Sequence, residues 1–204
     1  MGVNDINATF ENLSEEKRNS IINAAFSCFG KTGYKKTSTS DIAKAVGIPK
    51  SSLFKYFGTK RGMYLYLFQF ACDAVAMEVV EGPEDFFECI KLATDIKVRV
   101  AARFPGMFDF MISTLEEKGT DIYDDLKAIN DKRVDKGLDV IFKNVDWGKF
   151  KPGVDRSVAL NAVTWINEGY GRGKKEKDIK TICADLEMYM NLLKQSFYKE
   201  EYLK

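Results

Sequence analysis

Apolar residues along the chain recur at the three- and four-residue spacing of amphipathic helices, and no stretch shows the sustained alternation of a strand. The first clear example runs from residue 14 to 31. Ser14 can cap this helix, and Gly33 suits the left-handed position just past its end. Its apolar side is formed by Ile21, Ile22, Ala25, Phe26 and Phe29. The pattern predicts an all-α protein.

Two short helices are expected next, joined by a tight turn. Ser38 and Asp41 form a capping box that opens the first of them, and Gly47 ends it. Pro49 has no backbone N–H and a fixed φ, so it fits at or before the first turn of the second helix, which covers residues 50–57. A helix followed by two short helices with a Gly-containing turn is the plan of a helix-turn-helix unit.

The rest of the chain continues the helical pattern. Further helices are expected at 60–81, 84–103, 107–117, 122–144, 154–170 and 174–198. We therefore predict two domains, an N-terminal three-helix domain at residues 1–60 and a C-terminal helical domain at residues 61–204.

The charges are distributed unevenly between these two parts. Ten Lys or Arg residues lie between positions 17 and 62 against a single acid, Asp41, so this segment carries +9 in a chain of net charge +1. The remainder carries −8. A basic module attached to an acidic body is typical of a nucleic-acid binder with a separate second function.

The basic segment also carries a recognisable motif. Residues 33–64, GYKKTSTSDIAKAVGIPKSSLFKYFGTKRGMY, resemble the DNA-binding domain of the TetR (tetracycline repressor) family of bacterial regulators, and the resemblance covers about residues 14–66. The matching positions are Gly33-Tyr34, Thr37-Ser38, Ile42-Ala43, Gly47-Ile48, Phe54-Lys55-Tyr56-Phe57 and Lys60. Two positions depart from the family pattern: Pro49 replaces a capping Ser or Thr, and Phe54 replaces the more frequent Tyr.

The resemblance implies that the helix at 50–57 enters the major groove of double-stranded DNA. The residues expected near base edges are Lys50, Ser51, Ser52, Phe54 and Lys55. Those expected to hold phosphates, which set the register of the protein on DNA, are Thr37, Ser38, Tyr56 and Lys60. Thr37 and Ser38 are equally compatible with a capping role alone, and Tyr56 with a place in the core.

A single module of this kind binds DNA weakly, so we expect a homodimer that reads two half-sites of a palindrome. The last two helices carry apolar stripes with small residues, which favours a four-helix dimer interface. The same stripes are also compatible with a purely internal core.

The family resemblance further implies that the C-terminal domain binds a small molecule. The middle of the chain is rich in aromatic residues and methionines, which suit a largely apolar effector. The candidate ligand-binding residues are Phe68, Phe104, Met107, Phe108, Met111, Tyr123, Phe142, Trp165 and Glu168. The resemblance thus predicts a ligand-responsive regulator, most simply a repressor; the alternative is an architectural or partner-controlled DNA-binding protein without a small ligand.

Other classes of protein are disfavoured by the composition. The chain has no His and its four Cys are widely spaced, so neither a Ser/His/Asp set nor a zinc set is available. We expect no enzymatic activity, no metal and no cofactor. No apolar run reaches membrane-spanning length, and the first residues lack the pattern of a signal peptide. We therefore expect a cytoplasmic protein with no membrane partner.

Overall fold

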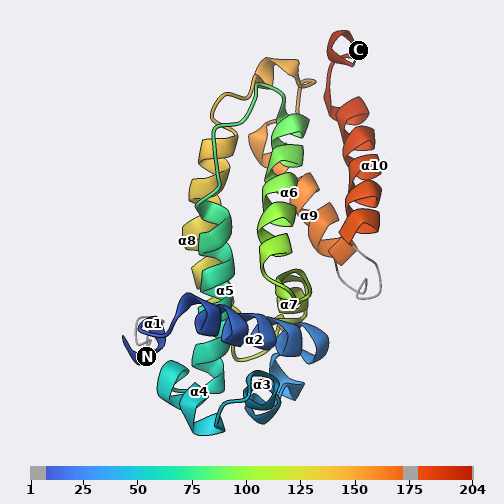
Figure 1. The fold of residues 1–204 in the computed structure, drawn as a ribbon. Coiled ribbons are helices and arrows are strands. Elements are labelled where there is room, and N and C mark those ends of the chain that lie inside the picture. Colours follow the sequence, from blue (N-terminus) through green and yellow to red (C-terminus); the bar gives the residue numbers. More distant parts are fainter. Residues whose placement is uncertain (1–7, 172–178, 204) are drawn as a thin grey trace. The chain divides into compact units, whose positions relative to one another are not determined.

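A computed structural model describes the backbone of residues 8–171 and 179–203, and within these ranges the regular structure is helical. The side chains of residues 132–135, 168 and 171–180 lie outside the description. The predicted all-α class is confirmed. The helices are α1 Ala8–Glu11, α2 Glu15–Lys36, α3 Thr39–Val46, α4 Lys50–Phe57, α5 Lys60–Ala76, α6 Phe86–Arg103, α7 Met107–Thr114, α8 Tyr123–Ile141, α9 Arg156–Gly171 and α10 Ile179–Phe197 (Figure 1). Short 3-10 turns lie at Leu115–Glu117, Trp147–Lys149 and Glu200–Tyr202.

The chain forms two compact units. Unit 1 comprises Met1–Met77 and Arg99–Val134, and unit 2 comprises Glu78–Val98 and Asp135–Lys204. The helix-turn-helix therefore packs in one unit with α5, α7 and the first part of α8. Sequence periodicity shows that each of these helices has an apolar side, but it does not show which neighbour covers that side.

The core of unit 1 is built where α7 lies against α2. The Phe110 ring packs on those of Phe26 and Tyr64, with ring centroids 5.1 and 4.9 Å apart. Two glycines allow this close approach: a Cβ on Gly30 would lie 2.8 Å from the backbone N of Phe110, and one on Gly106 would lie 2.7 Å from the backbone N of Ser27. The fit of α7 on α2 thus depends on the absence of two side chains.

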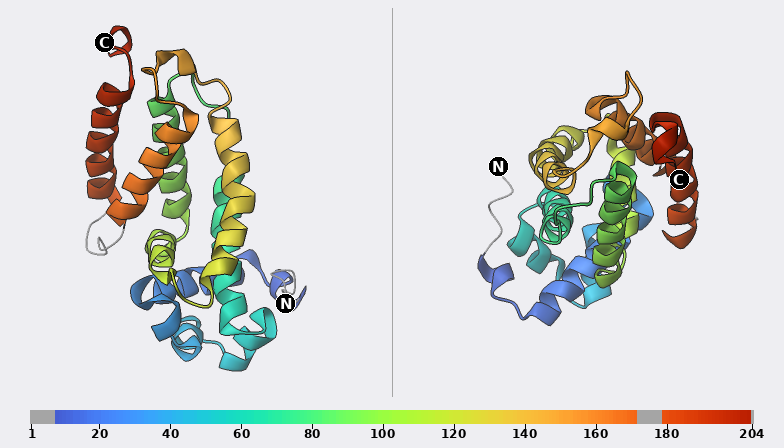
Figure 2. Two further views of the ribbon diagram at one scale, coloured as in Figure 1. Left: turned by 180° about the vertical axis from the view of Figure 1, so that it is seen from behind. Right: turned by 90° about the horizontal axis from the view of Figure 1, so that it is seen from above.

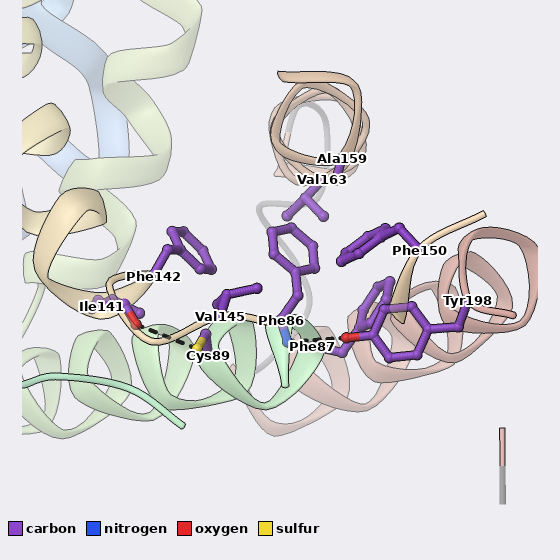
Figure 3. Close-up of a cluster of buried hydrophobic side chains, with 10 residues drawn as sticks. All are labelled: Phe86, Phe87, Cys89, Ile141, Phe142, Val145, Phe150, Ala159, Val163 and Tyr198. Atoms are coloured by element: carbon purple, nitrogen blue, oxygen red, sulfur yellow. Dashed lines mark hydrogen bonds between the residues drawn. The ribbon is translucent and has the colours of Figure 1, made fainter. Parts of the chain in front are cut away.

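The core of unit 2 is an aromatic cluster (Figure 3). The Phe86 ring stacks on Phe142 with centroids 5.1 Å apart, and Phe150 packs edge-on against Tyr198 at 4.8 Å. The Tyr198 hydroxyl accepts the backbone N–H of Phe86 at 3.0 Å. The buried Cys89 thiol donates to the backbone carbonyl of Ile141 at 3.3 Å. These bonds join the start of α6 to the end of α8 and to the chain after α10.

Helix α5 ends at Ala76, about five residues before the position predicted from periodicity. The following chain leaves the helix to make tertiary hydrogen bonds in unit 2: the Gly82 N–H donates to the carbonyl of Ile141 at 3.1 Å, and Asn144 donates to the Gly82 carbonyl. A Cβ on Gly82 would lie 2.4 Å from the Ile141 oxygen, so glycine is required at this approach. The helix is therefore shorter than the apolar periodicity predicts, because the chain after it makes long-range hydrogen bonds instead.

Helices α9 and α10 lie side by side in unit 2 (Figure 2). Helix α9 begins two residues later than predicted. Helix α9 starts at Arg156, where the Asp155 carboxylate accepts the N–H of Val158 at 3.0 Å. The described part of α10 starts at Ile179, and residues 174–178, with which the predicted helix begins, lie outside the described residues.

Candidate nucleic-acid interface

The local signals that predicted the helix-turn-helix are present in the structure. The Ser38 hydroxyl caps α3 by accepting the N–H of Ser40 at 3.1 Å. Gly47 ends α3 in the left-handed region with φ of 68°, and Pro49 with φ of −61° precedes the first residue of α4. Thr59 caps α5 by accepting the N–H of Gly62 at 2.9 Å. Each signal acts within a few residues, so each is readable from the sequence.

Helix α4 exposes one face and buries the other. Leu53 and Phe57 are buried in the small core of the module. Facing outward are Lys50, Ser51, Phe54 and Lys55, whereas Ser52 and Tyr56 are half-buried. Phe54 is 40% exposed, and the Lys50 ammonium lies 5.6 Å from its ring centroid. The predicted reading residues are thus gathered on one helix, and most are accessible.

An anchor that the sequence reasoning missed is Phe10 in α1. Its side chain is completely buried and packs against the rings of Tyr56, Phe57 and Tyr66 at centroid distances of 5.5, 4.8 and 5.7 Å. It therefore holds the C-terminal end of α4 from outside the motif. The signal available in the sequence was Phe10 itself, an aromatic residue that lies ahead of the predicted helix start at Ser14.

Thr37 and Ser38 differ although both were expected at phosphates. Thr37 is buried, and its hydroxyl is engaged internally with the carbonyls of Gly33 (2.7 Å) and Cys28 (3.2 Å) and with the hydroxyl of Thr32 (2.7 Å). These hydrogen bonds of the Thr37 side chain stabilise the C-terminal end of α2. Ser38 is exposed, although its hydroxyl also serves as the cap of α3.

Lys60 is held at the junction between α2 and α5. Its ammonium donates to the backbone carbonyls of Thr37 at 2.9 Å and Lys35 at 3.1 Å, and it lies 4.9 Å from the ring centroid of Tyr34. A cation at the C-terminal end of a helix also interacts favourably with the helix dipole. Lys60 therefore fastens the module internally, in addition to any contact with phosphate.

Acidic side chains from residues 117–125 contact both ends of the helix-turn-helix module, and the sequence analysis did not identify these contacts. The Glu117 carboxylate, 6% exposed, accepts the backbone N–H of Tyr34 at 3.0 Å. Arg61 pairs with Asp121 at 3.2 Å and Asp125 at 2.5 Å. Partial burial raises the pKa of the Tyr34 phenol, and the nearby Asp121 carboxylate adds to the rise. The partners are far apart in sequence, so periodicity carries no signal for them.

The predicted ligand-binding residues are distributed over both units. Unit 1 contains six of them: Phe68, Phe104, Met107, Phe108, Met111 and Tyr123. Phe68 and Met107 are buried in its core, and the other four are half-buried. In unit 2, Phe142 belongs to the aromatic cluster. The side chain of Glu168 lies outside the described residues.

Trp165 has a different environment from the one expected of a pocket residue. It is 71% exposed on α9, one heptad after the exposed Val158, so both lie on the same side of the helix. On α10, the exposed apolar residues Met188, Tyr189 and Leu192 form a similar side. We name these five residues the α9–α10 apolar face.

Among the residues that the structure describes, no helix combines the length and apolar character needed to cross a membrane.

Comparison with known proteins agrees with this geometry. The family model for bacterial regulatory proteins of the tetR family matches residues 21–67. The chain is 32% identical over 74 residues to the uncharacterized HTH-type transcriptional regulator YezE of Bacillus subtilis, covering 35% of this chain and 38% of YezE. It is 25% identical over 117 residues to IcaR of Staphylococcus aureus, the HTH-type negative transcriptional regulator of the biofilm operon icaADBC, covering 55% of this chain and 63% of IcaR. The matches thus span less than two thirds of either relative.

The fold extends the likeness to nearly the whole chain. A TetR family transcriptional regulator from Chloroflexus aurantiacus superposes with a TM-score of 0.65 at 18% identity, over 96% of this chain and 99% of that one. The fold and the exposed α4 define an all-α protein with an N-terminal helix-turn-helix module. The N-terminal module matches the model of the tetR family of bacterial regulatory proteins, so the resemblance predicted from the motif at residues 33–64 is confirmed.

Proposed function

We propose that this protein is a cytoplasmic transcriptional repressor that binds a palindromic operator as a homodimer and is released by a small, largely apolar effector. The observation that carries the proposal is the accessible face of α4, where Lys50, Ser51, Phe54 and Lys55 project from a helix held by a buried core. Lysine can donate to guanine, serine suits either base-pair pattern, and an aromatic edge suits the methyl group of thymine. Repression is proposed because IcaR is a negative regulator.

The phosphate contacts are proposed for Ser38, Tyr56 and Lys60, with Ser52 as a further base contact. Thr37 is left out, since its hydroxyl is engaged internally. The exposed Lys35 and Lys36 beside it supply positive charge at the same end of α2. Positive charge there favours DNA of any sequence and makes the affinity dependent on salt.

The dimer is proposed to form through the α9–α10 apolar face. Both helices expose large apolar side chains, and apolar side chains gathered on a surface indicate an interaction site. A two-fold pairing of this face would create a four-helix bundle from two copies of α9 and α10. The two α4 helices must then reach successive major grooves about 34–36 Å apart.

The effector site is proposed to involve the half-buried residues of unit 1, namely Phe104, Phe108, Met111 and Tyr123. Aromatic and methionine side chains form adaptable apolar walls. An effector can release the protein from DNA only if it binds the released state more tightly than the DNA-bound state.

Selection of duplexes from a random pool by the purified protein tests the proposal. We expect a palindromic winner, bound with a steep dependence of affinity on salt. Ser51→Ala should change the preferred bases, whereas the matched control Ser20→Ala, an exposed serine on α2, should leave them unchanged. Binding without sequence preference would favour an architectural protein, and a lack of binding at low salt would refute the proposal.

A further inference from the structure

We propose that Glu117, supported by Asp121 and Asp125, is a positioning residue for DNA binding, because segment 117–125 holds the helix-turn-helix at both its entrance and its exit. The inference rests on the proposed function and names residues outside the helix-turn-helix itself that would set its affinity for DNA.

At the entrance, the chain turns at Gly33 before it reaches α3. Gly33 has φ of 73° and ψ of 176° inside what is otherwise a continuous helix. Helical residues have ψ near −42°, so the Gly33–Tyr34 peptide is rotated away from the helical orientation. The Tyr34 N–H instead points at the Glu117 carboxylate, 3.0 Å away. Glu117 thus fixes the direction in which the chain leaves α2 toward the cap of α3.

At the exit, Arg61 in the first turn of α5 is held by the same segment. Its guanidinium contacts Asp121 at 3.2 Å and Asp125 at 2.5 Å. Lys60, one residue earlier, joins the exit to the entrance by donating to the carbonyls of Lys35 and Thr37. The two ends of the module are therefore tied to each other and to segment 117–125.

The segment itself is braced locally. The Thr120 N–H and hydroxyl both bond the Glu117 carbonyl, at 2.9 and 2.7 Å, and Ile122 is completely buried. Glu117 follows α7, which is closely fitted to α2 through Gly30 and Gly106. A shift of α7 along α2 would therefore move the carboxylate and, with it, the start of the helix-turn-helix.

The test is DNA affinity of the full chain, measured with the duplex selected above. Stoichiometric titration counts the active molecules, so a loss of folded protein changes the stoichiometry and leaves the dissociation constant of the active molecules unchanged. Glu117→Ala removes a charge-assisted hydrogen bond, and we expect affinity to fall on the order of ten-fold. The slope of affinity against salt should stay the same, because no phosphate contact is removed. Hydrogen exchange of the Tyr34 amide should accelerate.

Asp124→Ala is the matched control, since it removes the same charge from an exposed position of the same segment. We expect it to leave both affinity and Tyr34 exchange unchanged. Glu117→Gln keeps an acceptor oxygen and should recover most of the affinity lost in Glu117→Ala. If Glu117→Ala does not fold, the double variant Asp121→Asn/Asp125→Asn tests the exit side, where we expect affinity to fall about three-fold to ten-fold.

Unchanged affinity in Glu117→Ala together with faster Tyr34 exchange would overturn the inference, because the bond would then be broken without effect on DNA. A gain of affinity in the double variant would also overturn it, by showing that the two carboxylates withhold Arg61 from DNA. If the wild-type chain selects no duplex, it is the proposed function that fails. If the wild type binds the duplex and Glu117→Ala binds it equally tightly, the inference about Glu117 fails while the proposed function stands.

Discussion

Trp165 provides the sharpest test of how this chain assembles. It is 71% exposed, although tryptophan is large and apolar. A large aromatic side chain buries about 150–250 Å² when it is fully covered. Coverage of the exposed part by a partner would therefore remove about 110–180 Å² from water, which corresponds to about 3–4 kcal/mol at about 25 cal/mol per Å². A two-fold interface contains two copies of this contribution.

Replacing Trp165 by alanine should therefore weaken the proposed dimer strongly. Only part of the buried area is realised as binding free energy, so we expect the dissociation constant of the dimer to rise by about 100-fold, equivalent to about 2.7 kcal/mol. Sedimentation equilibrium over a range of protein concentrations measures this constant directly. Leu192→Ala, which truncates a residue that is 55% exposed on α10, should act in the same direction with a smaller effect.

Met77 supplies the matched control. It is 87% exposed and lies outside the α9–α10 apolar face, so Met77→Ala should leave the dimer unchanged. The chain contains two tryptophans, and a Trp147→Phe background leaves Trp165 as the single tryptophan, whose emission can be excited apart from that of the tyrosines. Its emission should shift to shorter wavelength as dimer forms. An unchanged dissociation constant in Trp165→Ala, with emission that stays typical of water at all concentrations, would refute the assignment of this face.

Three further predictions concern DNA binding and stability. Lys60→Ala should weaken binding to all duplexes about equally, and filter-binding titrations with unrelated sequences would detect any preference that contradicts this. Tyr198→Phe leaves the buried N–H of Phe86 without its acceptor, so urea unfolding should show a loss of about 1–3 kcal/mol; no loss would mean that water replaces the hydroxyl. Burial opposes ionisation of Asp85, but hydrogen bonds from Lys194 and two backbone N–H groups outweigh it and lower its pKa. This stabilisation is complete above the usual carboxyl pKa of about 4 and is lost as pH falls through the folded value, so Asp85→Asn should flatten the stability profile below about pH 4 in urea titrations.

The helix-turn-helix was predictable because its signals are local. The hydroxyl of Ser38, the left-handed Gly47 and the fixed φ of Pro49 act within a few residues of their own position. Such interactions do not depend on how the rest of the chain is folded. The bounds of α4 and the start of α5 consequently agree with the prediction residue by residue.

Features that depend on residues distant in sequence were decided by tertiary packing. The sequence offers Trp165 and Phe142 alike as aromatic candidates for an effector site, but only packing leaves the first 71% exposed and buries the second. Helix α5 stops at Ala76 because later residues bond the end of α8. An apolar stripe predicts that one side of a helix is buried, but it does not identify the element that packs against that side.

The two ends of the helix-turn-helix show the same division. The sequence at Gly33 predicts a positive φ, which the structure contains, although the ψ of 176° differs from that of a left-handed cap and α2 continues to Lys36. The acceptor for the next N–H is Glu117, 83 residues further along the chain, and it is brought there by the fit of α7 on α2. Local conformation follows from steric and hydrogen-bonding preferences of neighbouring residues, whereas a partner at this separation exists only once the core that carries it has formed.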